Sequence, residues 1–473
     1  MNAPLFDTAL FRQLTSGITE LAARELECTA EEPQFTGLTR DAVRARFEEP
    51  LPRQGMAAAE LLEILARDYA AEAQRLHHPR YIGHQVAPPV PVATAVDLLT
   101  STLNNGLAVW EMSPTGTMVE HAVLGWFAEL LGWPAGFGGS FVTGGAVGNL
   151  TALAAARAHL WPDAWRAGVG ARSGVIVTSE AAHYCIERAA GLLGLGSEAA
   201  IGVSTHAGRM VPEAADRALA RAADEGRSVL ALVATAGTTA LGALDPLDEL
   251  GAVAAAHGVW FHVDAAHAGS LLLSERFRPK LHGLERADSL AIDLHKMMFQ
   301  PISTALVLCR ERARLAAAFA QSAPYLLRDD AQEGYDLGGL TLQCSRRADA
   351  LRAWATLKLH GAAAIAALQD RTIETTQTAA ALIASAADFE LLHQPETNIL
   401  CFRHVPEPLA GDPAALDHHN DHVRDRLRAE RFAYLTGTTL ESRRVLRFTF
   451  MNPRTEHTHV AQVLDRIRSY GWS

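Results

Sequence analysis

Apolar residues recur at two different spacings along the chain, and the change of spacing divides it into three stretches. Residues 1 to about 75 carry apolar residues at helical spacing, most clearly from 57 to 69. This stretch ends at His78-Pro79, because a proline disfavours the helical conformation of the residue before it. The pattern therefore predicts a helical N-terminal region.

Between about residues 140 and 310, short apolar runs alternate with helical stretches. The runs lie at 175–177, 229–233, 259–263, 290–292 and 305–308. Short apolar strands separated by helices are typical of βαβ units, in which the sheet is mainly parallel. After about residue 345 the pattern is helical again and then mixed, with 445–450 as its clearest strand. We predict an α/β fold that is flanked by helical and mixed regions.

Composition and charge narrow the possible partners. Hydrophobic residues make up 49% and charged residues 20%, which is typical of a folded protein, and the formal charge of −11 argues against nucleic acid as the main partner. No apolar run reaches the ~18 residues of a membrane span, and the first residues do not resemble a signal peptide. The five cysteines are scattered and lack metal-ligand spacing. We expect a cytoplasmic protein with no nucleic-acid or membrane partner.

Reactive side chains follow four of the predicted strands. The first run leads to Ser179 and His183, the second to Thr235–Thr239, the third to Asp264–His267, and the fourth to Asp293–Lys296. In open α/β sheets, ligands bind beyond the carboxyl ends of the strands. Taken alone, an Asp after a strand is usually a cap or turn residue, and a His-Lys pair is usually solvated surface. Their occurrence in order after successive strands predicts a shared site.

A glycine-rich turn also precedes an alanine-rich helix. Gly144-Gly145-Ala146 stands at the expected start of this helix, where backbone N–H groups bind anions such as phosphate. A turn of this kind often has no ligand, so it supports the site only together with the strand-end residues. A dinucleotide site is disfavoured, because Gly191, Gly194 and Gly196 do not form the GxGxxG turn between a strand and a helix.

This set of residues suits an aldehyde cofactor. A lysine amine such as that of Lys296 forms a Schiff base with an aldehyde, which an incoming amino acid displaces. Pyridoxal 5'-phosphate needs a carboxylate beside its ring nitrogen, and Asp264 is suited to that role. His183 is suited to stack on the ring and to handle a proton. The turn at 144–146, together with His295, would hold the phosphate.

At this point the chain resembles the group II pyridoxal-dependent decarboxylases, which include glutamate, aromatic-amino-acid and diaminobutyrate decarboxylases. The matching residues are His78-Pro79-Arg80, 113–120, 144–145, His183, 262–266, 293–296, 343–347, Arg447 and Asn452-Pro453. The most specific match is the order and spacing of the Asp264 and Lys296 motifs. Met297 departs from the family, which usually has Trp after the lysine.

The resemblance implies a role for each matching residue around the cofactor. Lys296 resembles the Schiff-base lysine, Asp264 the partner of the ring nitrogen, and His183 the stacking imidazole. Ala266 resembles the small residue on the opposite ring face. Thr238 is expected among the cofactor-binding residues.

For the substrate, the resemblance implies two contacts and a proton donor. Arg447 resembles the arginine that binds the substrate carboxylate, for which a planar two-pronged donor is well suited. Gln85 is the second expected substrate contact. Family members carry a loop with a tyrosine that returns a proton after carbon dioxide leaves, and the equivalent stretch is 326–338, with Tyr335 its only tyrosine. His183 is the alternative donor.

The resemblance also implies an architecture. It predicts a fold-type-I pyridoxal-phosphate transferase fold with a helical arm (1–80), a large seven-stranded cofactor domain (81–350) and a small C-terminal α+β domain (351–473). A homodimer with its site at the subunit boundary is expected. The histidines in 417–422 are read as a solvated face, so no metal is assigned.

The expected reaction is decarboxylation of an L-amino acid to the primary amine. A diamino acid such as 2,4-diaminobutyrate is favoured, because 341–347 looks most like that branch of the family. Acidic or aromatic substrates remain open, as do oxidative aldehyde formation and transamination, because the same hold on the cofactor serves them all. A catalytically silent regulator is disfavoured, since Lys296 and Asp264 are both present.

Overall fold

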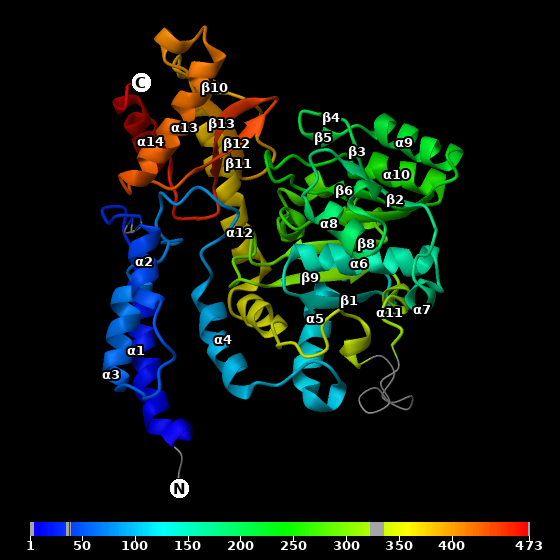
Figure 1. Cartoon of the computed structure of the whole chain (residues 1–473), viewed down its shortest axis with the longest axis horizontal. Helices are drawn as coiled ribbons and strands as arrows, with labels where there is room; N and C mark the ends of the chain where they lie inside the picture. Colours follow the sequence, from blue (N-terminus) through cyan, green and yellow to red (C-terminus); the bar gives the residue numbers. More distant parts are fainter. Residues whose placement is uncertain (1–3, 35–36, 38, 322–334, 472–473) are drawn as a thin grey trace. The chain divides into compact units, whose positions relative to one another are not determined.

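The computed structural model describes residues 4–34, 37, 39–321 and 335–471. The chain divides into two compact units (Figure 1). The central unit comprises Gln85–Thr376 and His393–Leu400, and the terminal unit comprises Met1–His84, Gln377–Leu392 and Cys401–Ser473. A division into three domains with boundaries near residues 80 and 350 stays a prediction.

A seven-stranded sheet forms the core of the central unit. Its strands lie in the order β1-β9-β8-β7-β6-β2-β3. Their bounds are β1 Gly138–Val142, β2 Gly174–Ser179, β3 Ala200–Val203, β6 Ser228–Thr235, β7 Trp260–Asp264, β8 Ser289–Asp293 and β9 Ala305–Cys309. The pairs β8·β7, β7·β6, β6·β2 and β2·β3 are parallel, and β9 is antiparallel to both of its neighbours. The predicted mainly parallel sheet is confirmed.

Most of the strands that were predicted from apolar runs are buried along their whole length. Every residue of β2, β7, β8 and β9 is buried. Strands of a parallel sheet are covered by helices on both faces, so their sequences read as nearly continuous apolar runs. The strand β1 gave a weaker signal, because two of its five residues are glycines. A two-stranded ribbon of β4 (Thr205–His206) and β5 (Arg209–Met210) lies apart from the sheet.

Helices surround this sheet (Figure 1). Helix α6 contacts β8 and β9, whereas α9 contacts β6 and α10 contacts β7. Prolines occupy the first turns of α4, α5 and α9, where their missing N–H groups cost no hydrogen bond. The bounds are α4 Pro91–Leu103, α5 Pro114–Leu130, α6 Gly145–Leu160, α7 Ala164–Ala167, α8 Cys185–Leu192, α9 Pro212–Asp224, α10 Leu247–His257, α11 Arg312–Ala317 and α12 Ala350–Ala384. Gly361 interrupts α12 with a non-helical conformation.

The terminal unit combines the N-terminal helices with an antiparallel sheet. The helices are α1 Thr8–Leu26, α2 Arg40–Phe47, α3 Ala58–Ile64, α13 Pro413–Ala429 and α14 His457–Ser469. The sheet has the order β10-β11-β13-β12, with bounds β10 Phe389–Leu391, β11 Ile399–His404, β12 Thr436–Leu440 and β13 Arg443–Thr449. The predicted late strand at 445–450 corresponds to β13. In the described chain, no helix combines the length and the apolar character needed to cross a membrane.

A buried ion pair holds the start of the sheet to its flanking helix. Both guanidinium N–H₂ groups of Arg346 donate to the Glu120 carboxylate at 2.6 Å. The same carboxylate accepts the backbone N–H of Phe141 in β1 at 3.1 Å. The Glu120 side chain is completely buried and that of Arg346 is 5% exposed. The pair therefore connects α5, β1 and the segment before α12, immediately upstream of the glycine-rich turn.

Removing one partner of this pair should destabilise the protein strongly. We expect Glu120→Ala to lower the free energy of unfolding by about 3–5 kcal/mol, because Arg346 keeps a buried, unpaired charge. The matched control is Asp163→Ala, which breaks the partly exposed pair with Arg172 and should cost far less, because solvent screens an exposed pair. Urea unfolding of the two variants measures the difference, and equal losses would contradict this role of the buried pair.

Candidate active site

The carboxyl ends of three neighbouring strands bring the candidate site together. Thr235 ends β6, Asp264 ends β7 and Asp293 ends β8. Thr235 lies opposite Asp264 in the register of β6 and β7, and Asp264 lies opposite Ala291 in β8. Because parallel strands end at the same edge of the sheet, residues distant in sequence meet there. The segments that follow these strands complete the site.

A cavity opens at this edge, entirely within the central unit. Seven of the predicted site residues line it: Gln85, Gly145, Ala146, His183, Asp264, Ala266 and Lys296. Seven further residues complete its lining: Asn149, Cys185, Thr235, Gly237, Thr239, His267 and Asp293. The strand-end lysine, aspartate and histidine that were predicted from sequence thus lie around one space.

Two buried carboxylates flank the lysine. The ammonium nitrogen Nζ of Lys296 lies 3.0 Å from Oδ2 of Asp293, and the side chains are 18% and 5% exposed. Burial raises the pKa of Asp264, and the nearby Lys296 charge opposes that rise. The backbone N–H of Ala266 donates to Oδ1 of Asp264 at 3.1 Å and orients the carboxylate. Asp264 is therefore an acid that a neighbouring cation would return to its ionised form.

The imidazole of His183 is held in a defined orientation. The backbone N–H of Cys185 donates to its Nδ1 at 3.3 Å. Burial lowers the pKa of His183, and the charge of Asp264 acts in the opposite direction. A neutral ring can stack on a planar ligand and can also accept or return a proton.

The glycine-rich turn is shaped by close contacts. Gly144 has a φ of 128°, which a residue with a side chain rarely adopts. A Cβ atom on Gly145 would lie 2.9 Å from the Cβ of Ala266, so only glycine lets α6 approach the segment after β7 this closely. The turn begins the 16-residue helix α6, whose first N–H groups form an anion-binding end.

A chain of buried hydrogen bonds fixes this helix against the sheet. His262 lies between Asn149 and Ser289, with its Nε2 2.9 Å from the Asn149 side-chain oxygen and its Nδ1 2.9 Å from the Ser289 hydroxyl. Trp260 donates to the same hydroxyl at 2.8 Å. The amide of Asn149 donates to the sulfur of Cys185 at 3.2 Å. Both Asn149 and Cys185 line the cavity, so the network positions part of its wall.

Three other predicted cofactor residues of the central unit are not among those lining the cavity. Thr238 is buried, and its hydroxyl accepts the N–H of Ala243 at 3.1 Å. Nδ1 of His295 lies 2.9 Å from the carbonyl of Thr304. Gly144 precedes the lining residue Gly145 as the N-cap of α6.

Tyr335 and Arg447 also lie outside this lining. The ring of Tyr335 lies beside those of Trp110 and His121, at centroid distances of 5.2 and 6.3 Å. Residues 326–334 of the predicted loop fall outside the described residues. Arg447 belongs to the terminal unit, where it donates from Nε to the Thr436 hydroxyl at 3.2 Å. The predicted roles of both residues stay predictions.

Sequence reasoning placed Asp293 among the residues at the strand ends but gave it no role. It stands at the end of β8, three residues before Lys296, where the strand-end rule that selected Asp264 also applies. His267 and Thr239 also line the cavity, but sequence reasoning gave them no role. Each of them lies beyond the end of its strand. His267 lies 2.7 Å from the side-chain oxygen of Asn398, which no local pattern indicates.

The donor set fits pyridoxal 5'-phosphate. The amine of Lys296 meets the requirement for an aldehyde, and the buried Asp264 carboxylate meets that for a protonated ring nitrogen. The end of α6 offers N–H groups to a phosphate. Gly145 and Ala266 approach each other closely, so the part of the cavity wall that they form consists of small residues. These groups lie around a single cavity, as such a ligand requires.

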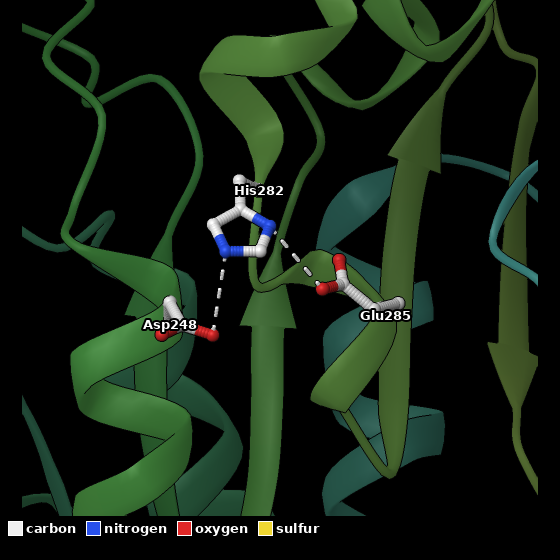
Figure 2. Close-up of side chains that lie close together, drawn as sticks. All are labelled: Asp248, His282 and Glu285. Atoms are coloured by element: carbon white, nitrogen blue, oxygen red, sulfur yellow. Dashed lines mark ion pairs between the residues drawn. The ribbon is translucent and has the colours of Figure 1, made fainter.

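One group of side chains outside the cavity has the composition of a cation site. In the described chain, Asp248, His282 and Glu285 bring their ligand atoms close together (Figure 2). The imidazole lies between the carboxylates, with nitrogen–oxygen distances of 3.7 and 3.4 Å. Nε of Arg286 also lies 2.5 Å from the Asp248 carboxylate. A guanidinium already pairs with one of the two carboxylates, so we assign no metal to this cluster.

Several residues of the histidine-containing segment 417–422 form hydrogen bonds or ion pairs with other residues of the terminal unit. Asp417 binds Arg403, Asp421 binds Arg444, and His419 contacts His404 at 2.8 Å between ring nitrogens. His419 and Asn420 are buried. The prediction of a solvated face was therefore wrong for these two residues, because they point from α13 towards β11.

Comparisons with known proteins agree on one family. Residues 43–405 match the family model described as the pyridoxal-dependent decarboxylase conserved domain. The chain is 37% identical over 438 residues to an L-2,4-diaminobutyrate decarboxylase of Rhizobium meliloti (strain 1021), with 92% of this chain and 86% of that protein covered. It is 32% identical over 421 residues to the acidic amino acid decarboxylase GADL1 of Xenopus tropicalis, with 86% and 81% covered. The crystal structure of mouse CSAD is 28% identical with a TM-score of 0.93, with 99% and 100% covered, which confirms the predicted fold.

The buried network makes stability depend on pH. Burial lowers the pKa of His262 to about 4, whereas the unfolded chain has the ordinary value near ~6.5. As the pH falls from 6.5 towards 4, the unfolded chain binds a proton that the folded chain excludes, so stability is lost. We expect His262→Gln to reduce the loss between pH 6.5 and 4.5 by about 2–3 kcal/mol.

Urea unfolding at the two pH values measures this effect, and groups that both proteins share cancel in the comparison. The control is His206→Gln, which removes an exposed histidine and should keep the wild-type loss. A His262→Gln variant with the wild-type pH dependence would show that the folded protein accommodates the charged ring.

Proposed function

Because this chain belongs to the pyridoxal-dependent decarboxylase family, we propose that it removes the α-carboxylate of an L-diamino acid such as 2,4-diaminobutyrate. The chain is an amino-acid decarboxylase that uses pyridoxal 5'-phosphate. The products of the proposed reaction are carbon dioxide and the corresponding primary amine. The observation that carries the proposal is the charge of the cavity around Lys296.

Acidic groups dominate that cavity. Asp264 and Asp293 line it, and Lys296 is the sole lysine or arginine among the described lining residues. An acidic substrate would need a second cation for its side-chain carboxylate, whereas a diamino acid brings its own positive charge. Phe, Tyr and Trp are missing from the described lining, which offers no aromatic platform for an aromatic substrate. The 37% identity to a diaminobutyrate decarboxylase supports the same choice.

The bound cofactor supplies an electron-withdrawing ring that weakens the bonds at the substrate α-carbon. Several residues would hold it. Lys296 would attach it, Asp264 would face its ring nitrogen, and His183 and Ala266 would lie on its two faces. The turn at Gly144, Gly145 and Ala146 would bind the phosphate, with Thr238 and His295 in support.

Asp264 has the central electrostatic role. Burial favours the neutral form of the Asp264 carboxyl group. A protonated ring nitrogen beside it would supply a positive charge, which favours the ionised form instead. The carboxylate in turn holds that proton on the nitrogen. The hydrogen bond from the Ala266 N–H fixes the carboxylate in advance, so no reorganisation is needed when the substrate arrives.

Lys296 and His183 have the two proposed roles closest to the reacting atoms of the substrate. The Lys296 amine, which lies beside Asp293, would hold the cofactor until a substrate amine takes its place. His183 lines the cavity and is the proposed donor that returns a proton to the substrate carbon, with Tyr335 as the alternative donor. Arg447 and Gln85 are the proposed contacts for the substrate carboxylate. We also propose a cytoplasmic homodimer, on the strength of the family resemblance.

A panel of amino acids tests the proposed substrate. We expect carbon dioxide release from 2,4-diaminobutyrate to exceed that from glutamate, cysteine sulfinate and aromatic amino acids by at least about tenfold in kcat/KM, a difference of about 1.4 kcal/mol. Lys296→Ala should abolish release together with the absorbance of attached cofactor. The exposed Lys358→Ala is the matched control and should keep both. Higher kcat/KM on an acidic or aromatic substrate would overturn the diamino assignment.

A second variant tests the electrostatic role of Asp264. We expect Asp264→Asn to fold normally and to lose at least about a hundredfold in kcat, because an amide does not hold the ring proton. Asp216→Asn, which changes an exposed carboxylate on α9, should keep the wild-type rate. Activity of Asp264→Asn within threefold of wild type would show that this carboxylate does not act on the ring.

A further inference from the structure

One carboxylate oxygen in the cavity has no hydrogen-bond partner. Asp293 is 4% exposed, and its Oδ2 lies 3.0 Å from Nζ of Lys296 and 3.7 Å from Nε2 of His295. Its Oδ1 is buried and, within the described part of the chain, receives no hydrogen bond. A buried carboxylate oxygen without a partner is costly, so its position calls for a ligand that it can contact.

The Asp293 carboxylate lies against the start of α6. A Cβ atom built on Gly145 would lie 3.2 Å from both carboxylate oxygens of Asp293, so these atoms stand directly against the glycine turn. The first turn of a helix attracts anions through its N–H groups and its dipole. Asp293 therefore stands beside the place at which the proposed function puts the cofactor phosphate.

A phosphate and an ionised carboxylate are poor neighbours there. A phosphate monoester carries close to two negative charges at neutral pH, and like charges that share a buried site cannot all remain ionised. A protonated carboxyl removes the conflict, since its O–H donates to a phosphate oxygen. We propose that Asp293 is a proton-linked contact of the cofactor phosphate, which takes up one proton when the phosphate binds. This inference rests on the proposed placement of the phosphate at Gly144–Ala146.

The other titratable groups around Asp293 are poorly suited to accept that proton. Lys296 and His295 face it from its own segment, Asp264 from β7, and His183 and Cys185 from the segment after β2. Burial raises the pKa of Cys185 to about 12, so its thiol is already protonated. Asp264 is engaged by the ring nitrogen, and Lys296 by the cofactor aldehyde. Among the carboxylates of the described lining, Asp293 is left as the group that can respond to the phosphate.

The experiment compares proton uptake by wild type and Asp293→Asn. Calorimetric titration of cofactor-free enzyme with pyridoxal 5'-phosphate, in buffers of different ionisation enthalpy, counts the protons that are taken up. At pH 8 we expect wild type to take up about one proton more than the variant. By linkage, the ratio of the wild-type Kd to the variant Kd should rise with pH between pH 7 and 9. The exposed Asp224→Asn is the control and should match wild type.

Pyridoxal, which lacks the phosphate, separates this role from a simple pairing with Lys296. With pyridoxal, we expect wild type and Asp293→Asn to take up the same number of protons. Asp293→Ser, whose hydroxyl donates without titrating, should behave like the Asn variant and covers the case in which Asn fails to fold. Equal proton uptake with pyridoxal 5'-phosphate, or the same difference with pyridoxal, would overturn the proposal. Both titrations are carried out without an amino-acid substrate. Their outcome therefore tests the role of Asp293 and leaves the proposed substrate to be tested by carbon dioxide release.

Discussion

The burial of two carboxylates around one lysine is the constraint on which the site depends. Asp264 and Asp293 are 5% and 4% exposed, and burying a charge is costly unless an opposite charge or hydrogen bonds compensate. Lys296 supplies one positive charge to this pair. Asp264 would receive a protonated ring nitrogen, and the proposed diamino-acid substrate brings its own second positive charge, so it needs no further lysine or arginine from the described lining.

The surrounding fold keeps these charges in place without contacting a ligand. The ion pair of Glu120 with Arg346 holds β1, which leads directly into the glycine turn. The hydrogen-bond network through His262 and Asn149 connects the sheet to helix α6, which begins at this turn. Both supports are buried polar groups, which specify one arrangement because any other leaves a polar atom unsatisfied. The helix end that faces Asp293 is thus fixed from two directions.

This arrangement also shows how one family serves different amino acids. The chain is similar over most of its length to relatives named for diaminobutyrate and for acidic amino acids. In the proposed site, Lys296, Asp264 and His183 would hold the ring in the same way for each substrate, so these residues bear on the reaction class and not on the substrate. The proposed discrimination between substrates rests on the charge of the remaining lining. The absence of a second lysine or arginine from the described lining is the feature that favours a diamino acid here.

The sequence by itself determined the mainly parallel sheet and the order of its reactive ends, and it predicted the chemistry of Lys296, Asp264 and His183. These inferences depend on local patterns, because buried parallel strands give apolar runs and their ends meet at one edge. Tertiary structure alone decided where the side chains of His295, Tyr335 and Asp293 point. His295 contacts the carbonyl of Thr304 across a turn, and Tyr335 lies against the ring of Trp110, far from it in sequence. The unpartnered oxygen of Asp293 arises from the approach of α6 to β8, and such contacts between distant segments leave no periodic signal in the sequence.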